Sequence, residues 1–186
     1  MEALVTAFVA AFLAIWGDRI QLIVAGLSAA TRRPVMVMAG LALAALASSI
    51  VAAIAGIWIA AMITIRAMTL MTALALLFGG AAALIRPRRK EQAPTGWPLA
   101  TAFILCLAAA MGDSAQFLTF ALAGRFAGAP LAAAGATAGI IAACLPAALL
   151  GDRLEATLPI RAIRYVVAAL FLIAGFIVAM KALQLA

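Results

Sequence analysis

Long apolar runs separated by short polar breaks make up almost the whole chain. Each run holds about 20 residues or more, the length that an α-helix needs to cross the hydrocarbon core of a bilayer. The runs lie at roughly 3–29, 34–57, 64–85, 98–122, 130–150 and 160–183. The pattern predicts an all-α integral membrane protein with six transmembrane helices.

Turn-forming and charged residues mark most of the breaks between these runs. The clearest breaks are TRRP at 31–34, GRFAGAP at 124–130 and GDRLEATLP at 151–159. By contrast, GIWIAAMITIR at 56–66 is nearly as apolar as the spans that it separates. Only the basic, proline-containing segment 86–97 has the composition of a linker. We expect one membrane domain with a first repeat at 1–85, a cytoplasmic linker at 86–97 and a second repeat at 98–186.

A constant offset of 95 positions aligns the second half of the chain with the first. The matching pairs are Gly17 with Gly112, Asp18 with Asp113, Gln21 with Gln116, Gly40 with Gly135, Gly56 with Gly151, Arg66 with Arg161 and Gly80 with Gly175. Each half holds three helices, and because three is odd, the second half crosses the membrane in the opposite orientation. Such inverted repeats are typical of secondary transporters, which bind their substrate near the midplane where the halves meet.

Composition agrees with this class and excludes a soluble domain. Of the 186 residues, 69% are hydrophobic and 10% are charged, and the mean hydropathy is +1.25. A soluble core of this size could not bury so much apolar surface. The net charge of +7 does not indicate a nucleic-acid partner, because the basic residues lie mostly in short connections between spans.

Basic residues are distributed unevenly between the two sides of the predicted membrane domain. The first, third and fifth connections with their flanks hold nine of them: Arg32, Arg33, Arg86, Arg88, Arg89, Lys90, Arg153, Arg161 and Arg164. The opposite side holds three: Arg66, Arg125 and Lys181. This bias predicts a multi-pass protein of the cell (inner) membrane with both termini non-cytoplasmic. Because the N-terminus carries Glu2 and no basic leader region, we expect its first span to be retained.

The sequence offers no constellation of residues for enzyme chemistry. Histidine is absent, and no nucleophile has a general base beside it. Cys106 and Cys144 lie inside apolar runs, where we expect small packing residues rather than a disulfide or metal pair. We therefore expect a non-enzyme that needs no cofactor.

Two polar clusters interrupt the apolar spans, WGDRIQ at 16–21 and MGDSAQ at 111–116. Asp18 and Asp113 lie just past the centres of their spans, where an unpaired charge costs a few kcal/mol, about 3 on insertion scales. Gln21 and Gln116 follow three positions later, on the same helix face. Two carboxylates and two amide oxygens form a hard oxygen shell that suits Ca²⁺, Mn²⁺ or Mg²⁺.

The glycine before each aspartate, Gly17 and Gly112, allows close backbone approach or local unwinding. A purely structural interpretation also remains open. Asp18 and Arg19 can form a buried ion pair, and Gln21 and Gln116 can hold the helix bundle together through interhelical hydrogen bonds.

The two clusters resemble the GDT-one family of small cation/proton antiporters, whose signature is E-x-G-D-[KR]-[ST], often continuing to Gln. The resemblance extends over the whole chain, from MEALVTAFVAAFLAIWGDRIQL to LPIRAIRYVVAALFLIAGF. It implies a lysine-exporter-superfamily transporter that exchanges Mn²⁺ or Ca²⁺ for protons. The family residues that it carries over are Asp18, Arg19, Gln21, Asp113 and Gln116, with both aspartates as metal ligands.

The chain departs from this signature at several positions. The two glutamate positions are Ile15 and Ala110, and the two hydroxyl positions are Ile20 and Ala115. Ser114 stands at the second basic position. Loss of both glutamates removes two charges and two ligands, so we expect weaker affinity for a divalent cation.

Three hypotheses follow for the function. The first is a transporter that exports Mn²⁺ or Ca²⁺, in exchange for protons, by alternating access around the Asp/Gln site. The second is a transporter of a monovalent cation or another small solute. The third is a non-transporting degenerate paralogue that serves as a structural or regulatory membrane subunit. In each case the surroundings are a lipid bilayer, and a homodimer is compatible with the sequence.

Overall fold

The computed structural model describes residues 1–85 and 96–183, and every regular element in these ranges is helical. The helices of the first half are α1 (Glu2–Ile15), α2 (Arg19–Thr31), α3 (Pro34–Met62) and α4 (Ile65–Leu84). Those of the second half are α5 (Pro98–Ala110), α6 (Ser114–Phe126), α7 (Ala129–Leu150), the short elements η1 (Gly151–Arg153) and α8 (Leu154–Thr157), and α9 (Ile160–Ala182). Most of the expected linker, 86–95, lies outside the described residues.

Four of these helices, α3, α4, α7 and α9, are individually long and apolar enough to cross a membrane. The pairs α1–α2 and α5–α6 reach this length only together, with bends of 66° and 67° between their members. Counting each bent pair as one span gives the six expected spans. The spans expected over 3–29 and 98–122 are each interrupted at the polar cluster, where Gly17 and Gly112 were expected to allow local unwinding.

A glycine and a capping aspartate explain each interruption. Gly17 and Gly112 adopt φ angles of +73° and +85°, in the left-handed region that only glycine enters at little cost. The aspartate that follows is the N-cap of the next helix: Asp18 accepts from the Ile20 N–H and Asp113 from the Ser114 N–H. A side-chain acceptor at this position compensates for the missing helical partners of the first N–H groups.

The connection between α3 and α4 is shorter than the sequence suggests. α3 continues to Met62, five residues beyond the expected end, and Ile63 and Thr64 alone join it to α4. Thr64 starts α4 by accepting from the Ala67 N–H. Because the segment before it contains neither proline nor charge, nothing local ends α3 earlier.

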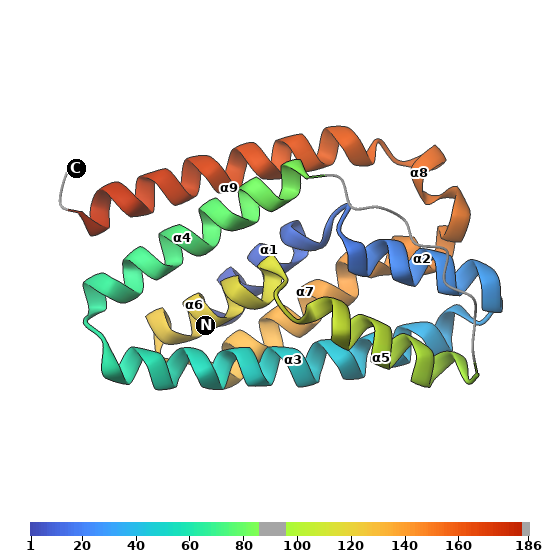
Figure 1. Ribbon diagram of the computed structural model, residues 1–186, viewed down its shortest axis with the longest axis horizontal. Coiled ribbons are helices and arrows are strands. Elements are labelled where there is room, and N and C mark those ends of the chain that lie inside the picture. The colour runs from blue at the N-terminus through green and yellow to red at the C-terminus, as the bar shows by residue number, and fades with distance from the viewer. Residues whose placement is uncertain (86–95, 184–186) are drawn as a thin grey trace.

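Helices of one half of the chain pack mainly against helices of the other half. α1 lies against α7 and α5 lies against α3, so each broken helix packs on a helix of the other half. At the breaks, α1 contacts α6 and α2 contacts α5. α4 and α9 pack along each other and form one side of the molecule (Figure 1).

Close contacts at two glycines show that the packing between the halves follows the sequence repeat. A Cβ on Gly40 would meet the carbonyl oxygen of Leu99, and a Cβ on Gly135 would meet that of Leu4. The two contacts are equivalent, because Gly135 is the repeat mate of Gly40 and Leu4 is the repeat mate of Leu99. The chain is thus an all-α membrane protein whose two halves make equivalent contacts.

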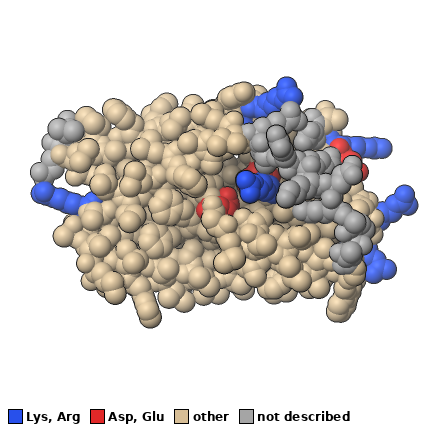
Figure 2. Space-filling view, in the orientation of Figure 1, with Lys and Arg blue, Asp and Glu red and all other residues tan. Residues whose placement is uncertain are grey.

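Charged side chains on the face in Figure 2 are sparse. Acidic and basic groups meet at a hollow near the middle of this face, and further basic groups gather mainly at the end that holds α8. Large apolar side chains cover much of the remaining surface, including Trp58, Leu149 and Ile173. Cys106 and Cys144 are both buried free thiols, in agreement with a packing role.

Candidate cation site

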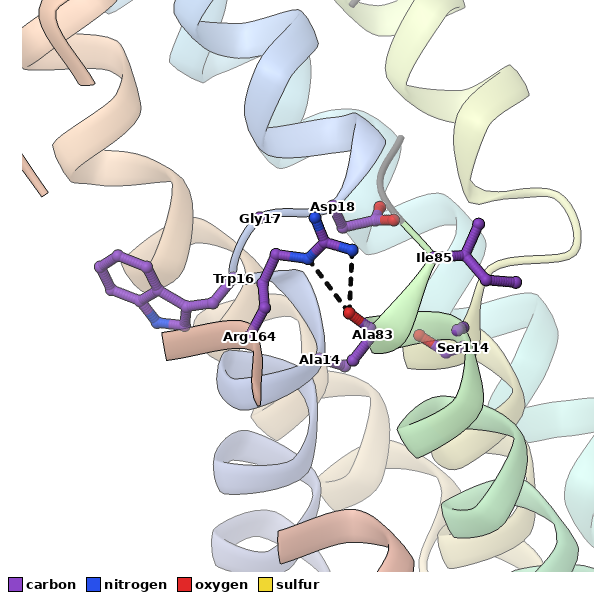
Figure 3. Close-up of a pocket in the computed structure, with 9 residues that line it drawn as sticks. Ala14, Trp16, Gly17, Asp18, Ala83, Ile85, Ser114 and Arg164 are labelled. Carbon is purple, nitrogen blue, oxygen red and sulfur yellow. Dashed lines mark hydrogen bonds between the residues drawn. The ribbon is translucent and has the colours of Figure 1, made fainter. Parts of the chain in front are cut away.

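The two helix breaks lie next to one another in the middle of the fold. Asp18 and Asp113 are close enough for their charges to interact. A pocket beside them is lined by residues of α1, the first break, α4, α6 and α9 (Figure 3). Its lining residues are Ala14, Trp16, Gly17, Asp18, Ala82, Ala83, Ile85, Ser114 and Arg164.

The two aspartates use their oxygens differently. Asp18 is half-buried, and its Oδ2 accepts from the Ile20 N–H at 3.3 Å. Asp113 is also half-buried, and its Oδ1 accepts from the Ser114 N–H at 2.7 Å and from the Ser114 hydroxyl at 3.4 Å. The second oxygen of Asp113, Oδ2, is buried and has no hydrogen-bond partner among the described residues. A buried carboxylate oxygen without a donor is a vacant position for a proton or a cation.

Gln21 is fully engaged in hydrogen bonds within the fold. Its Oε1 accepts from the Gly17 N–H at 2.8 Å, and its Nε2 donates to the Ala143 carbonyl of α7 at 2.9 Å. The first bond holds the unwound backbone at the break, and the second ties α2 to the other half. The Gln21 oxygen, which was expected to be a ligand, thus already accepts one hydrogen bond.

Gln116 is only half engaged. Its Nε2 donates to the Ser48 hydroxyl of α3 at 2.9 Å, while its Oε1 is buried without a partner. Ser48 and Ala143 are themselves related by the repeat offset, so both glutamines tie to equivalent positions. Interhelical bonds thus occur as the structural interpretation expects, although the glutamines do not bond to each other. The oxygen of Gln116 remains available as a ligand.

The other motif positions divide between the pocket and the core. Ser114 lines the pocket, whereas Arg19 is exposed and does not. The two glutamate positions and the two hydroxyl positions of the signature are all buried in apolar packing. These are Ile15, Ile20, Ala110 and Ala115.

Arg164 is the site residue that sequence reasoning missed. Its place near a connection predicts a basic residue at the cytoplasmic side. In the structure it lies inside α9, and only 8% of its surface is exposed. Its Nε and Nη2 donate to the Ala83 carbonyl at 3.1 and 2.8 Å. The available signal in the sequence was the position of this charge, four residues inside an apolar run. Its repeat mate, Thr69, carries no charge.

The arrangement favours a cation. The C-terminal ends of α1 and α4 both reach the pocket, through Ala14 and through Ala82 and Ala83. Helix C-termini carry partial negative charge, which adds to that of the two carboxylates. The N-termini of α2 and α6, which Asp18 and Asp113 cap, carry partial positive charge that offsets part of it. Among the described residues there is no group of three or more His, Cys, Asp or Glu side chains that could hold a metal. A cation here would depend on two carboxylates plus amide, hydroxyl and carbonyl oxygens, a donor set for hard ions.

Comparison with known proteins identifies a family with this architecture. The family model described as divalent cation/proton antiporter GDT1 matches the chain twice, at residues 3–91 and 98–186. A Vibrio cholerae protein named "Putative manganese exporter" is 29% identical over 176 residues, which cover 93% of this chain and 88% of that protein. No solved structure matches. The repeated match over nearly the whole chain shows that this protein belongs to the GDT1 family of divalent cation/proton antiporters.

Proposed function

We propose that the protein exports a divalent cation, Mn²⁺ or Ca²⁺, across the inner membrane in exchange for protons. The cation binds between the two helix breaks, with Asp18, Asp113 and the Gln116 amide oxygen as ligands. Gln21 positions the first break instead of binding the ion. Both termini lie on the non-cytoplasmic side, in keeping with the bias of basic residues.

The observation that carries this proposal is the adjacency of two matched helix breaks, each with an aspartate at its N-cap. Broken helices at mid-membrane supply ion sites in secondary transporters because their exposed backbone groups line a cavity. The buried, unpartnered oxygens of Asp113 and Gln116 support the same position. The named manganese exporter among the relatives favours Mn²⁺ as the cargo.

Exchange follows from the competition of protons and metal for the same carboxylates. A metal ion requires both aspartates ionised, whereas a proton neutralises one of them and prevents binding. Alternation between these two occupants couples metal export to proton entry. The site becomes open to either side by alternating access, in which the two halves rock around Asp18 and Asp113.

A monovalent cation is the second candidate. Two carboxylates and the Arg164 guanidinium leave a single net negative charge at the site, which a monovalent ion balances. This alternative predicts that Na⁺ or K⁺, and not Mn²⁺ or Ca²⁺, drives proton movement through the purified protein.

Proton movement driven by Mn²⁺ or Ca²⁺ in liposomes tests the proposal directly. We expect flux in the wild type, and a loss of at least about tenfold in Asp18→Asn and in Asp113→Asn, because each removes one charged ligand. The matched control is Glu2→Gln, which removes an exposed acid at the start of α1 and should retain wild-type flux.

Two results would refute the proposal. The first is metal-driven flux at wild-type level in both aspartate variants. The second is a wild-type protein that folds and inserts normally yet moves neither metal nor protons.

A further inference from the structure

We infer that Arg164 is a tethered cation that offsets the charge of Asp18 while the site is empty and competes with the transported cation for it. The inference rests on the proposed function only for the identity of the competing ion. The role of the guanidinium depends on contacts among this chain's own residues.

Arg164 reaches the site because the first break leaves room for its side chain. A Cβ on Gly17 would collide with Cγ and Cδ of Arg164 and with Ile160. The aliphatic part of Arg164 therefore passes directly over the Gly17 backbone (Figure 3). The positive φ and the missing side chain of Gly17 together give the guanidinium its path into the pocket.

The guanidinium is held at the pocket by the end of α4. Ala83 lies in the last turn of that helix, where carbonyl groups have no helical partner. Two donors of Arg164 bond to this single carbonyl, and the charge also complements the negative end of the helix dipole. These bonds fix the cation at a defined place in the pocket that it shares with Asp18.

Arg164 and Asp18 face one pocket, so their charges interact across it although the hydrogen bonds of Arg164 go to Ala83. Both groups lie within the membrane-spanning part of the fold and line one pocket. Charges interact more strongly there than at an aqueous surface, because less water screens them. Arg164 thus lowers the cost of an ionised Asp18 in the absence of cargo, and its positive charge opposes an arriving metal ion.

Among the described residues, no cation takes the equivalent place at the second break. The repeat mate of Arg164 is Thr69, which is uncharged and half-buried and donates its hydroxyl to the Ile65 carbonyl of its own helix. Gly112, the mate of Gly17, has nothing within 4 Å of where a Cβ would lie. Within the described part of the chain, Arg164 therefore offsets charge at Asp18 and no matching cation does so at Asp113. The Oδ2 of Asp113 keeps no hydrogen-bond partner there.

A double-mutant cycle between Asp18 and Arg164 tests the charge pairing without any metal. Thermal unfolding in detergent is compared for wild type, Asp18→Asn, Arg164→Gln and the double variant. The lost bonds to Ala83 are common to both Arg164→Gln proteins, so they cancel in the cycle. We expect the double variant to unfold at least about 4 °C above the temperature that additive single effects give.

Arg161→Gln is the matched control, because Arg161 lies one turn earlier on α9 and is exposed. Its cycle with Asp18→Asn should be additive. If Arg164→Gln alone does not accumulate as folded protein, recovery of folded protein in the double variant is the supporting result. Additive unfolding temperatures, or failure of Asp18→Asn to recover the fold, overturn the inference.

Titration with Mn²⁺ tests the competition. We expect Arg164→Gln to bind Mn²⁺ about tenfold more tightly than either the wild type or Arg161→Gln, since a positive charge is removed from the pocket. Equal affinities for Arg164→Gln and Arg161→Gln would overturn the competition. Absence of Mn²⁺ binding in every protein would refute the proposed Mn²⁺ function, whereas the cycle would still decide whether Arg164 offsets Asp18.

Discussion

The two motif glutamines show how one sequence position acquires two roles. Gln21 and Gln116 occupy equivalent places in the repeat, and both donate to a helix of the other half. Gln21 also accepts from the Gly17 N–H, whereas the oxygen of Gln116 has no partner. Gln21 is therefore a structural tie at the first break, and Gln116 keeps an oxygen that a cation can use.

Truncation of each glutamine should separate these roles. Gln21→Ala leaves the buried Gly17 N–H without a partner and removes the bond to the Ala143 carbonyl of α7, and it should lower the free energy of unfolding by about 2–3 kcal/mol. Gln116→Ala loses one hydrogen bond and should cost about 1 kcal/mol, but it should weaken Mn²⁺ binding more than Gln21→Ala does. Chemical denaturation in detergent and metal titration measure the two effects, and equal stability losses would contradict the assignment.

At the level of elements, the breaks in the first and fourth spans depend on a helix-start signal inside an apolar run. Both motifs read Gly-Asp-x-x-Gln, in which the aspartate is the N-cap and the glutamine occupies the third helical position. This spacing matches a capping box. Hydrophobic length made each run look continuous, but the capping residues within it already indicated where a second helix begins.

Alanine at each break glycine tests how the two breaks differ. Gly112→Ala should cost about 1–2 kcal/mol, which is the price of a left-handed conformation for a residue with a Cβ. Gly17→Ala should cost more, because its Cβ would also displace Arg164 and Ile160. Unfolding of the two purified variants in detergent gives the comparison, and a smaller loss for Gly17→Ala would contradict the close packing of Arg164.

At the level of the whole molecule, the repeat appears as pairs of equivalent contacts between the halves. Gly80 meets the Leu172 side chain and Gly175 meets that of Leu77, so α4 and α9 cross at matching points. The packing is not equivalent throughout. α4 packs against α6, but among the described residues the matching pair α9 and α2 has no comparable contact. Equivalent sequence positions therefore make different contacts in the two halves.

Substitution of the matched glycines Gly40 and Gly135 tests the equivalence of the halves. Alanine at either position places a Cβ against a backbone carbonyl of the other half, so each should destabilise the fold by a similar amount, about 1–3 kcal/mol. Gly26→Ala is the control, since nothing lies near its Cβ, and helix propensity should make it neutral or slightly stabilising. Strongly unequal losses at Gly40 and Gly135 would contradict the repeat in three dimensions.

The sequence by itself determined the membrane class, the number of spans, the repeat and the two aspartates. These features depend on the length of apolar runs, on a constant offset and on the cost of charge in lipid, all of which are properties of a linear chain. Only the tertiary structure decided which glutamine oxygen is occupied and that Arg164 lies beside Asp18. Those facts depend on which distant segments pack together, and an arginine near a span end looks the same in sequence whether it faces the cytoplasm or a buried pocket.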